Sequence, residues 1–170
     1  ANAILKEIRK GVTREEALET GLLTKQAGII NIPEIIIGFP SETRTTVEET
    51  IDFLKQLDTW SFSINTPIPF PGTPLWEHAV RHGLIKDEEE FVLGYRRGLF
   101  INFTKFSDRE LLSLVAKVHY DPYLSWLKRR GHFLLYLKTM LVRIFAVNLR
   151  QVIPGGIFAG IRMIYHRSGF

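Results

Sequence analysis

The chain has 170 residues, of which 45% are apolar and 24% charged, a balance typical of a globular protein that buries a hydrophobic core. It contains no cysteine, which excludes disulfides, zinc thiolate sites, cysteine nucleophiles and iron–sulfur ligation by its own residues. Residues 1–121 hold 14 Lys and Arg against 18 Asp and Glu, whereas residues 122–170 hold eight Lys and Arg and no acid. We therefore expect a basic appendage on a mildly acidic body.

The amino-terminal residues carry no recognisable targeting signal. Ala1 to Ile4 lack an initiator Met, a basic region and an apolar core, so this end is interpreted as a cut end. No uninterrupted apolar run approaches the roughly 20 residues that span a bilayer. We expect a cytoplasmic protein, with the option of peripheral attachment at the inner membrane.

The first predicted elements are a helix and a strand. Thr13 and Glu16 have the spacing of a capping box, and the helix that they begin is predicted to end at Gly28. Ile29 to Ile37 is rich in isoleucine, a composition typical of a strand buried on both faces of a parallel sheet. Because Pro33 has no N–H to donate, the paired part of this strand is predicted to begin after it and to span Glu34 to Ile37.

The same order of strand, loop and helix then repeats. After the turn Gly38 to Thr43, apolar residues recur on one face of a predicted helix: Val47, Ile51, Leu54 and Leu57. Trp60 to Thr66 alternates apolar and polar residues and predicts a second strand. Thr73 and Pro74 supply an N-cap and a first-turn proline for a helix that ends near Gly83.

Two successive β/α units predict an α/β fold with a parallel sheet, and both connecting loops leave the carboxyl edge of that sheet, where such folds bind ligands. Two strands are too few to close a barrel. We therefore expect a partial TIM-type parallel (β/α) barrel followed by a basic helical tail. The expected division is residues 1–83 as the carboxyl-terminal part of the barrel, 84–121 as a flanking loop and helix region, and 122–170 as the tail.

The second half of the chain follows a different pattern. Residues 84–106 are predicted to be mixed loop with a short strand, and Ser107 with Glu110 forms a capping box for a further helix. Asp121 and Pro122 are predicted to open the tail, whose helix breaks near residues 154–156. One face of that helix is apolar (Leu134, Leu137, Leu141, Ile144 and Phe145), and bases lie roughly opposite (Lys128, Arg129, Arg143 and Arg150).

The two loops carry a family resemblance. Residues 35–43 read IIIGFPSET and residues 69–75 read PFPGTPL. Together they resemble the strand, "GFPGET" turn and "PGTPLY" loop of the radical SAM superfamily, especially members with an upstream cobalamin-binding domain, such as the anaerobic Mg-protoporphyrin ester cyclase group. The segment from Leu5 to Gly28 is similar to the helix before that strand. Ser41 departs from the pattern, because it replaces the second glycine of the turn.

The resemblance implies an enzyme half-barrel that binds S-adenosylmethionine at its carboxyl edge. The residues implied in cofactor binding are Ile36, Gly38, Phe39, Pro40, Glu42, Asn65 and Gly72, while no catalytic residue is assigned. An iron–sulfur cluster would be held by cysteines of a missing amino-terminal half, and cobalamin by a further domain. The parent protein would begin radical chemistry on a small-molecule substrate, leading to oxidative cyclisation or methyl transfer, and this chain alone would be inactive.

Structural interpretations of the two loops stay open beside this. Gly38 to Thr43 is also typical of an ordinary β/α turn, with Ser41 or Thr43 as the helix cap and Glu42 favoured by the helix dipole. It lacks the lysine and the glycines of a phosphate-binding loop, so a barrel enzyme with a phosphate ligand would need an anion at the helix after Ser41. Pro67 to Pro74 is also typical of a rigid connector that shapes the rim of a pocket.

The remaining charged groups have two interpretations each. His78 and His82 have the spacing of a metal pair but no third ligand nearby in sequence, so they are interpreted as surface histidines and no metal site is predicted. Asp87 to Glu90 is interpreted as a solvated helix start. The tail either contacts an anionic membrane surface or packs its apolar face on the barrel or a missing domain. Its separated bases do not form a nucleic-acid patch. A rival function is therefore a non-catalytic, membrane-surface binding module on a half-barrel scaffold.

Overall fold

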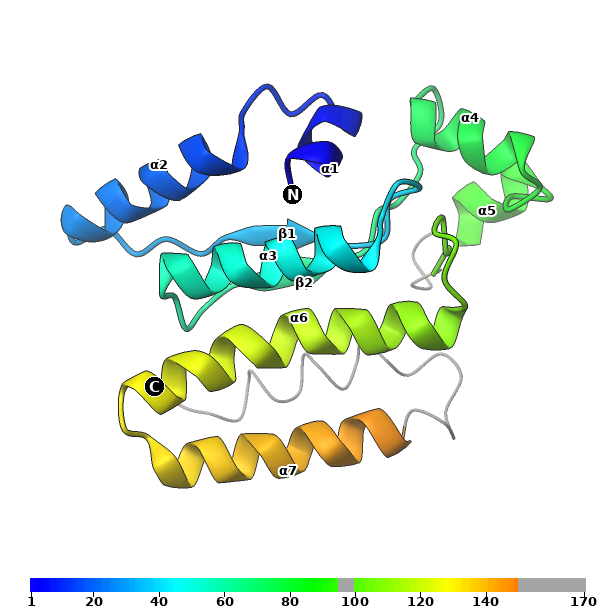
Figure 1. Ribbon diagram of the computed structural model, residues 1–170. Coiled ribbons are helices and arrows are strands. Elements are labelled where there is room, and N and C mark those ends of the chain that lie inside the picture. Colours follow the sequence, from blue (N-terminus) through cyan, green and yellow to red (C-terminus); the bar gives the residue numbers. More distant parts are fainter. Residues whose placement is uncertain (95–99, 150–170) are drawn as a thin grey trace.

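A computed structural model describes residues 1–94 and 100–149 (Figure 1). The helices and strands follow in the order α1 (Asn2–Glu7), α2 (Arg14–Gln26), β1 (Glu34–Ile36), α3 (Arg44–Leu57), β2 (Ser63–Asn65), α4 (Pro74–Arg81), α5 (Glu88–Gly94), α6 (Asp108–Arg129) and α7 (Phe133–Leu149). Figure 1 shows α6 lying between α7 and the α3 and sheet region, with α1 and α2 on the far side of the sheet from α6. The described part of the chain is thus a mostly helical α/β structure.

The sheet has two parallel strands in the described residues, β1 and β2. Ile35 pairs with Ile64 and Ile36 with Asn65, and the Ile37 N–H continues the ladder by donating to the Asn65 carbonyl at 3.0 Å. The order β1, α3, β2 confirms the predicted β/α repeat. A partial (β/α) unit is therefore present, and these residues do not close into a barrel.

Local capping signals explain where four helices begin. Thr13, Thr43, Thr73 and Ser107 each accept a hydrogen bond from a backbone N–H in the first turn of the helix that follows, as the sequence predicted for these positions. Thr43, rather than Ser41, caps α3. Glu16 and Glu110 complete the two predicted capping boxes.

The main hydrophobic core lies between one face of the sheet, α3 and α6. The predicted apolar face of α3 is buried as expected, with Val47, Ile51 and Leu54 at 0% exposure. Ile37 and Phe62 join this core from the strands, and α6 contributes Leu111, Leu114, Val115 and Val118. Burial of these side chains at roughly 25 cal/mol per Å² is the main force that holds the β/α unit to α6.

The prediction that Ile29 to Ile37 is buried on both faces is wrong for this structure. Ile29, Ile30 and Ile32 are 59%, 81% and 56% exposed, and Ile36 is 41% exposed. The reason is that α3 and α6 cover only one face of β1, the face that carries Ile35 and Ile37. The second strand is also shorter than the predicted Trp60 to Thr66.

The region after α4 differs from the prediction in two ways. Residues 84–94 contain the helix α5 where a mixed loop was expected, and no strand lies in residues 84–94 or 100–106. Asp87 accepts from the Glu90 N–H at 2.8 Å and so caps α5, which agrees with a solvated helix start. Helix α6 continues through Asp121 and Pro122, so the residue predicted to open the tail lies inside a helix.

Helix α7 packs on α6 by a different face from the predicted one. Tyr136 and Met140 contact Ala116, Tyr120 and Leu124, whereas Leu134 and Leu141 are 84% and 54% exposed. The expectation that the leucine face packs on the barrel is therefore wrong for the described residues. The expected helix break at residues 154–156 and the base Arg150 lie outside them. Within the described helices, none combines the length and apolar character needed to cross a bilayer.

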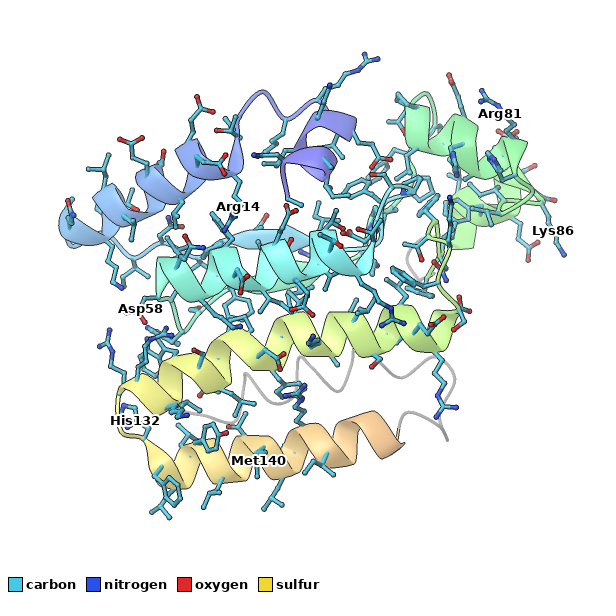
Figure 2. The ribbon with its side chains drawn as sticks, in the orientation of Figure 1. Arg14, Asp58, Arg81, Lys86, His132 and Met140 are labelled. Carbon is cyan, nitrogen blue, oxygen red and sulfur yellow. The ribbon has the colours of Figure 1, made fainter. Side chains whose placement is uncertain are left out.

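Asp58 joins three helices at the end of α3 (Figure 2). Its carboxylate accepts hydrogen bonds from Lys25 of α2 at 3.0 Å, Arg129 of α6 at 2.7 Å and Arg130 at 3.0 Å. Partial burial alone would raise the pKa of Asp58, but the bonds from Arg129, Lys25 and Arg130 outweigh it and lower the pKa from 3.8 to about 2. One carboxylate thereby holds α2, α3 and α6 together.

Candidate cofactor-binding face of the sheet

The face of the sheet that is turned away from α3 and α6 carries Glu34 and Ile36 of β1 and Asn65 of β2. We call these three residues the open face. All three side chains are exposed, and the register places Ile36 directly beside Asn65. Because alternate residues of a strand point to opposite faces, the burial of Ile35 and Ile37 against α3 and α6 fixes the outward direction of Ile36. An apolar side chain and a side-chain amide therefore stand next to each other at the end of the parallel strands.

Gly38 brings the two predicted loops together just beyond the open face. Its φ of +118° lies in a region that L side chains rarely adopt, and a Cβ at this position would lie 3.4 Å from Pro67 Cδ and 3.6 Å from Leu111 Cδ2. The first residue of the turn thus lies against the first residue of the proline-rich loop. Glycine is favoured here by its backbone conformation, since an added Cβ would make only ordinary van der Waals contacts with Pro67 and Leu111.

Glu42 has a structural role that its sequence position did not reveal. The side chain is only 4% exposed, and its carboxylate accepts from the Gly38 N–H at 3.1 Å and from the Thr46 hydroxyl. Burial raises the pKa of Glu42, while the hydrogen bonds from Thr46 and Gly38 act in the opposite direction. The carboxylate therefore closes the turn between β1 and α3.

A cavity of about 320 Å³ adjoins the edge of β1 that does not pair with β2. Its lining includes Ile4 of α1, the following Ile8, Ile36 and Phe39 near the turn, and Phe53 of α3. Phe39 is 9% exposed, so it forms part of the wall. The walls of the cavity are mostly apolar.

The remaining loop residues lie differently. Pro40 is half-buried in the turn, and the exposed Ser41 donates to Glu7 of α1. Gly72 has a φ of +81°, but an added Cβ there would meet no heavy atom within 4 Å. The structure therefore brings Ile36, Gly38, Phe39 and Glu42 around the end of β1 beside Asn65, and it does not pack Gly72 against them.

The two histidines at the carboxyl end of α4, His78 and His82, contact each other. The rings of His78 and His82 stack with centroids 4.1 Å apart, and Phe103 lies beside His78. His82 Nδ1 lies 2.9 Å from the His78 carbonyl. Among residues 1–94 and 100–149, no three His, Cys, Asp or Glu side chains lie close enough together to hold a metal ion.

Two contributors to this region were not predicted from the sequence. Ile4 of α1 and Ile8 at its carboxyl end line the cavity, and their spacing of four residues was the available signal. The inward carboxylate of Glu42 had no local signal, because a glutamate before a helix is ordinarily solvated and favoured by the helix dipole. Its burial depends on contacts with Gly38 and Thr46.

Comparison with known proteins gives partial similarities. The chain is 32% identical over 125 residues to an uncharacterised methyltransferase of Pyrococcus horikoshii, which covers 71% of this chain and 26% of that protein. It is 32% identical over 114 residues to the tRNA-2-methylthio-N(6)-dimethylallyladenosine synthase of Thermotoga petrophila, covering 65% of this chain and 24% of that protein. It is 34% identical over 91 residues to the ribosomal protein uS12 methylthiotransferase of Desulforamulus reducens, covering 52% and 20%.

No family model matches the chain, and no solved structure matches it. The chain spans about a quarter of the length of the first two curated relatives. The names of these relatives refer to methyl or methylthio transfer, whereas the loop motifs alone also left oxidative cyclisation open. The chain therefore has a distant, partial similarity to methyltransferase and methylthiotransferase proteins.

Proposed function

We propose that the chain forms one side of the S-adenosylmethionine pocket of a radical SAM methyltransferase or methylthiotransferase. The observation that carries the proposal is the meeting of the two loop motifs at Gly38 and Pro67, beside the exposed pair Ile36 and Asn65. The similarity to a methyltransferase and a methylthiotransferase supports the same class of chemistry.

The residues present fit one face of such a cofactor. Ile36 offers an exposed apolar surface for the adenine ring, and the Asn65 amide offers a donor and an acceptor to the ribose hydroxyls or the substrate. The absence of a side chain at Gly38 allows close approach to the backbone of the turn. Phe39, Pro40 and Glu42 hold the turn in place, and Gly72 would act at the rim of the pocket.

Glu42 acts through the turn rather than on the cofactor. Both of its oxygens are already engaged, one by the Gly38 N–H and one by the Thr46 hydroxyl. A positioning role fits this arrangement better than direct cofactor contact. Glu42 is thus proposed to hold Gly38 where the cofactor would lie.

The metal half of the pocket would come from polypeptide outside this chain. A reduced iron–sulfur cluster in such enzymes supplies the electron that cleaves S-adenosylmethionine, and this sequence offers no cysteine to ligate one. We expect the completing segment to carry a cysteine triad spaced by three and two residues. Methyl transfer through cobalamin is the narrower form of this proposal and would need a further domain. The substrate would be a small molecule held between the two halves.

Equilibrium dialysis with radiolabelled S-adenosylmethionine tests the cofactor face. We expect measurable binding to the full chain, and a loss of about tenfold in affinity for Asn65→Ala, because a ligand hydrogen bond is removed. Gln56→Ala, which removes an exposed amide from α3, is the matched control and should bind as the unmodified chain does. Equal binding by Asn65→Ala and the unmodified chain would contradict the assignment of Asn65.

A further inference from the structure

Helix α7 turns an unusual side toward the body of the protein, since several of its large apolar side chains face outward. Its mixed polar face turns inward, where Tyr136 and Met140 pack on α6 and Arg143 Nη1 lies 2.7 Å from Asp121 Oδ1. Figure 2 shows Met140 between the two helices. A helix that packs on a globular body normally turns its apolar stripe inward and its charges outward. Here Tyr136, Met140 and the ion pair of Arg143 with Asp121 hold the inward side against α6.

The outward side of α7 is therefore apolar. We call its exposed residues the outer face of α7, and they are Phe133 (68% exposed), Leu134 (84%), Leu135 (43%), Leu141 (54%) and Ile144 (49%). Leu134, Leu141 and Ile144 lie on one side of the helix, seven and three residues apart, with Phe133 and Leu135 in its first turn. Large exposed apolar side chains gathered on one helix favour an interaction site.

Bases lie beside this outer face. Arg129 and Arg130 are engaged by Asp58, and Arg143 by Asp121, but Lys128 and Lys138 are exposed and form no ion pair within the described residues. Lys128 lies in the last turn of α6, and Lys138 lies on α7 itself. Residues 122–170 contain eight Lys and Arg and no Asp or Glu. Helix α7 itself thus carries two bases, Lys138 and Arg143, and no acid.

The charge distinguishes between possible occupants. A second copy packed on this face would place Lys138 of one chain near the bases of the other, and these like charges would repel each other. Residues 150–170 of the same chain add Arg150, Arg162 and Arg167 and no acid, so they would also bring like charges together. An anionic lipid surface supplies both an apolar layer and negative charge, and it complements both features.

We propose that the outer face of α7 binds the surface of an anionic membrane. The apolar side chains enter the headgroup region, and Lys128 and Lys138 contact lipid phosphates. Since no described helix can cross a bilayer, the contact is interfacial. This inference rests on α7 alone and stands independently of the cofactor pocket proposed above.

Flotation of the full chain with lipid vesicles tests the proposal. Vesicles of phosphatidylcholine with phosphatidylglycerol should carry the chain to the top of the gradient, while phosphatidylcholine alone should bind it less well. Binding should weaken as salt is raised. Leu141→Ser should lower the partition coefficient about tenfold through lost apolar burial, and Lys138→Gln about fivefold through the lost charge.

Two matched substitutions serve as controls. Leu23→Ser changes a leucine of α2 that is 57% exposed, close to the 54% of Leu141, and should leave vesicle binding unchanged. Lys86→Gln removes an exposed lysine far from α7 and should do the same (Figure 2). Circular dichroism verifies that each variant is folded.

Three outcomes would overturn the proposal. The first is the absence of binding to anionic vesicles at low salt. The second is a result in which Leu141→Ser and Lys138→Gln bind anionic vesicles as strongly as the two control variants do. The third is a concentration-dependent dimer, seen by analytical ultracentrifugation, that Leu141→Ser abolishes while vesicle binding persists, since the outer face would then belong to a second copy.

Discussion

At the scale of single residues, Glu42 decides the geometry of the turn between β1 and α3. Its buried carboxylate links the Gly38 N–H to the Thr46 hydroxyl and so fixes the first turn of α3 relative to the end of β1. Removing the carboxylate leaves a buried N–H without its acceptor. We expect Glu42→Ala to lower the free energy of unfolding by about 1–3 kcal/mol, measured by urea denaturation.

The raised pKa of Glu42 also predicts a pH dependence. A carboxyl group whose pKa is raised in the folded state contributes stability that is full below its ordinary value of 4.5 and is lost as the pH rises through the raised value. Because glutamine does not titrate, the Glu42→Gln variant does not lose stability in this way as the pH rises. The difference in unfolding free energy between Glu42→Gln and the unmodified chain should therefore shift in favour of the variant between pH 4.5 and neutral pH.

Urea denaturation across that pH range measures the difference. Glu19→Gln, which changes an exposed glutamate of α2, is the control and should show no comparable shift in favour of the variant. A difference between Glu42→Gln and the unmodified chain that does not change with pH would show that Glu42 titrates as an ordinary carboxyl group.

Residue types alone predicted part of this region. The turn that begins at Gly38 and the caps at Thr13, Thr73 and Ser107 follow from local residue types, and the structure contains them. The inward direction of Glu42 could not be predicted, because it depends on Gly38 and Thr46 being brought together across the turn. Local patterns do not encode such contacts.

At the scale of elements, α2 packs closely on α3 through Gly21. A Cβ added at Gly21 would lie 2.4 Å from Leu57 Cδ1, and Leu57 itself is only 3% exposed. In an open helix, Gly→Ala would gain about 1 kcal/mol of helix propensity. Here overpacking outweighs that gain, and Gly21→Ala should lower the free energy of unfolding by about 1 kcal/mol.

Chemical denaturation distinguishes the two effects. Glu19→Ala raises helix propensity at an exposed position of the same helix and should not destabilise the chain. An increase in stability for Gly21→Ala would mean that Leu57 moves aside without cost.

The Asp58 cluster is the second device that joins elements. A carboxyl group with a lowered pKa contributes stability above its unfolded value of 3.8, and that stability is lost as the pH falls toward about 2. Asn tolerates the left-handed backbone that Asp58 adopts at φ 52°, so Asp58→Asn removes charge without adding strain. Because the cluster is partly solvated, the expected cost at neutral pH is about 1 kcal/mol.

Asp52→Asn is the matched control for this change. Asp52 lies on the same helix and makes a single exposed pair with Lys55 at 3.5 Å, so its loss should be close to neutral. Thermal unfolding at pH 7 and at pH 2.5 should show that the Asp58→Asn effect is clearly smaller in acid. An equal effect at both values would contradict an electrostatic origin.

At the scale of the whole molecule, the periodicity of the sequence correctly predicted the order of helices and strands from α2 to α4. It did not always predict correctly which faces of the helices and strands are buried. The β/α repeat and the buried face of α3 follow from spacing in the sequence. The exposure of Ile36 and of the segment Ile29–Ile32 does not, because composition cannot tell which neighbours cover a strand. The same limit applies to α7, where Tyr136 and Met140 contact α6 while Leu134 and Leu141 are exposed.

The exposure of Ile36 on the open face bears on the proposed function. A strand with isoleucines on both faces is suited to a sheet that is covered on both sides. In the described structure one side of β1 packs on helices, and the other presents Ile36 beside Asn65 and the Gly38 turn. We interpret that side as the surface on which the cofactor and the missing half of the pocket would meet.

Two-dimensional NMR of the isotopically labelled chain, titrated with S-adenosylmethionine, tests this interpretation most directly. The account predicts saturable changes in the amide signals of Ile36, Gly38 and Asn65, and none at Leu134 or Leu141 of α7. Saturable changes confined to residues away from the carboxyl ends of β1 and β2, or no change at all, would contradict it.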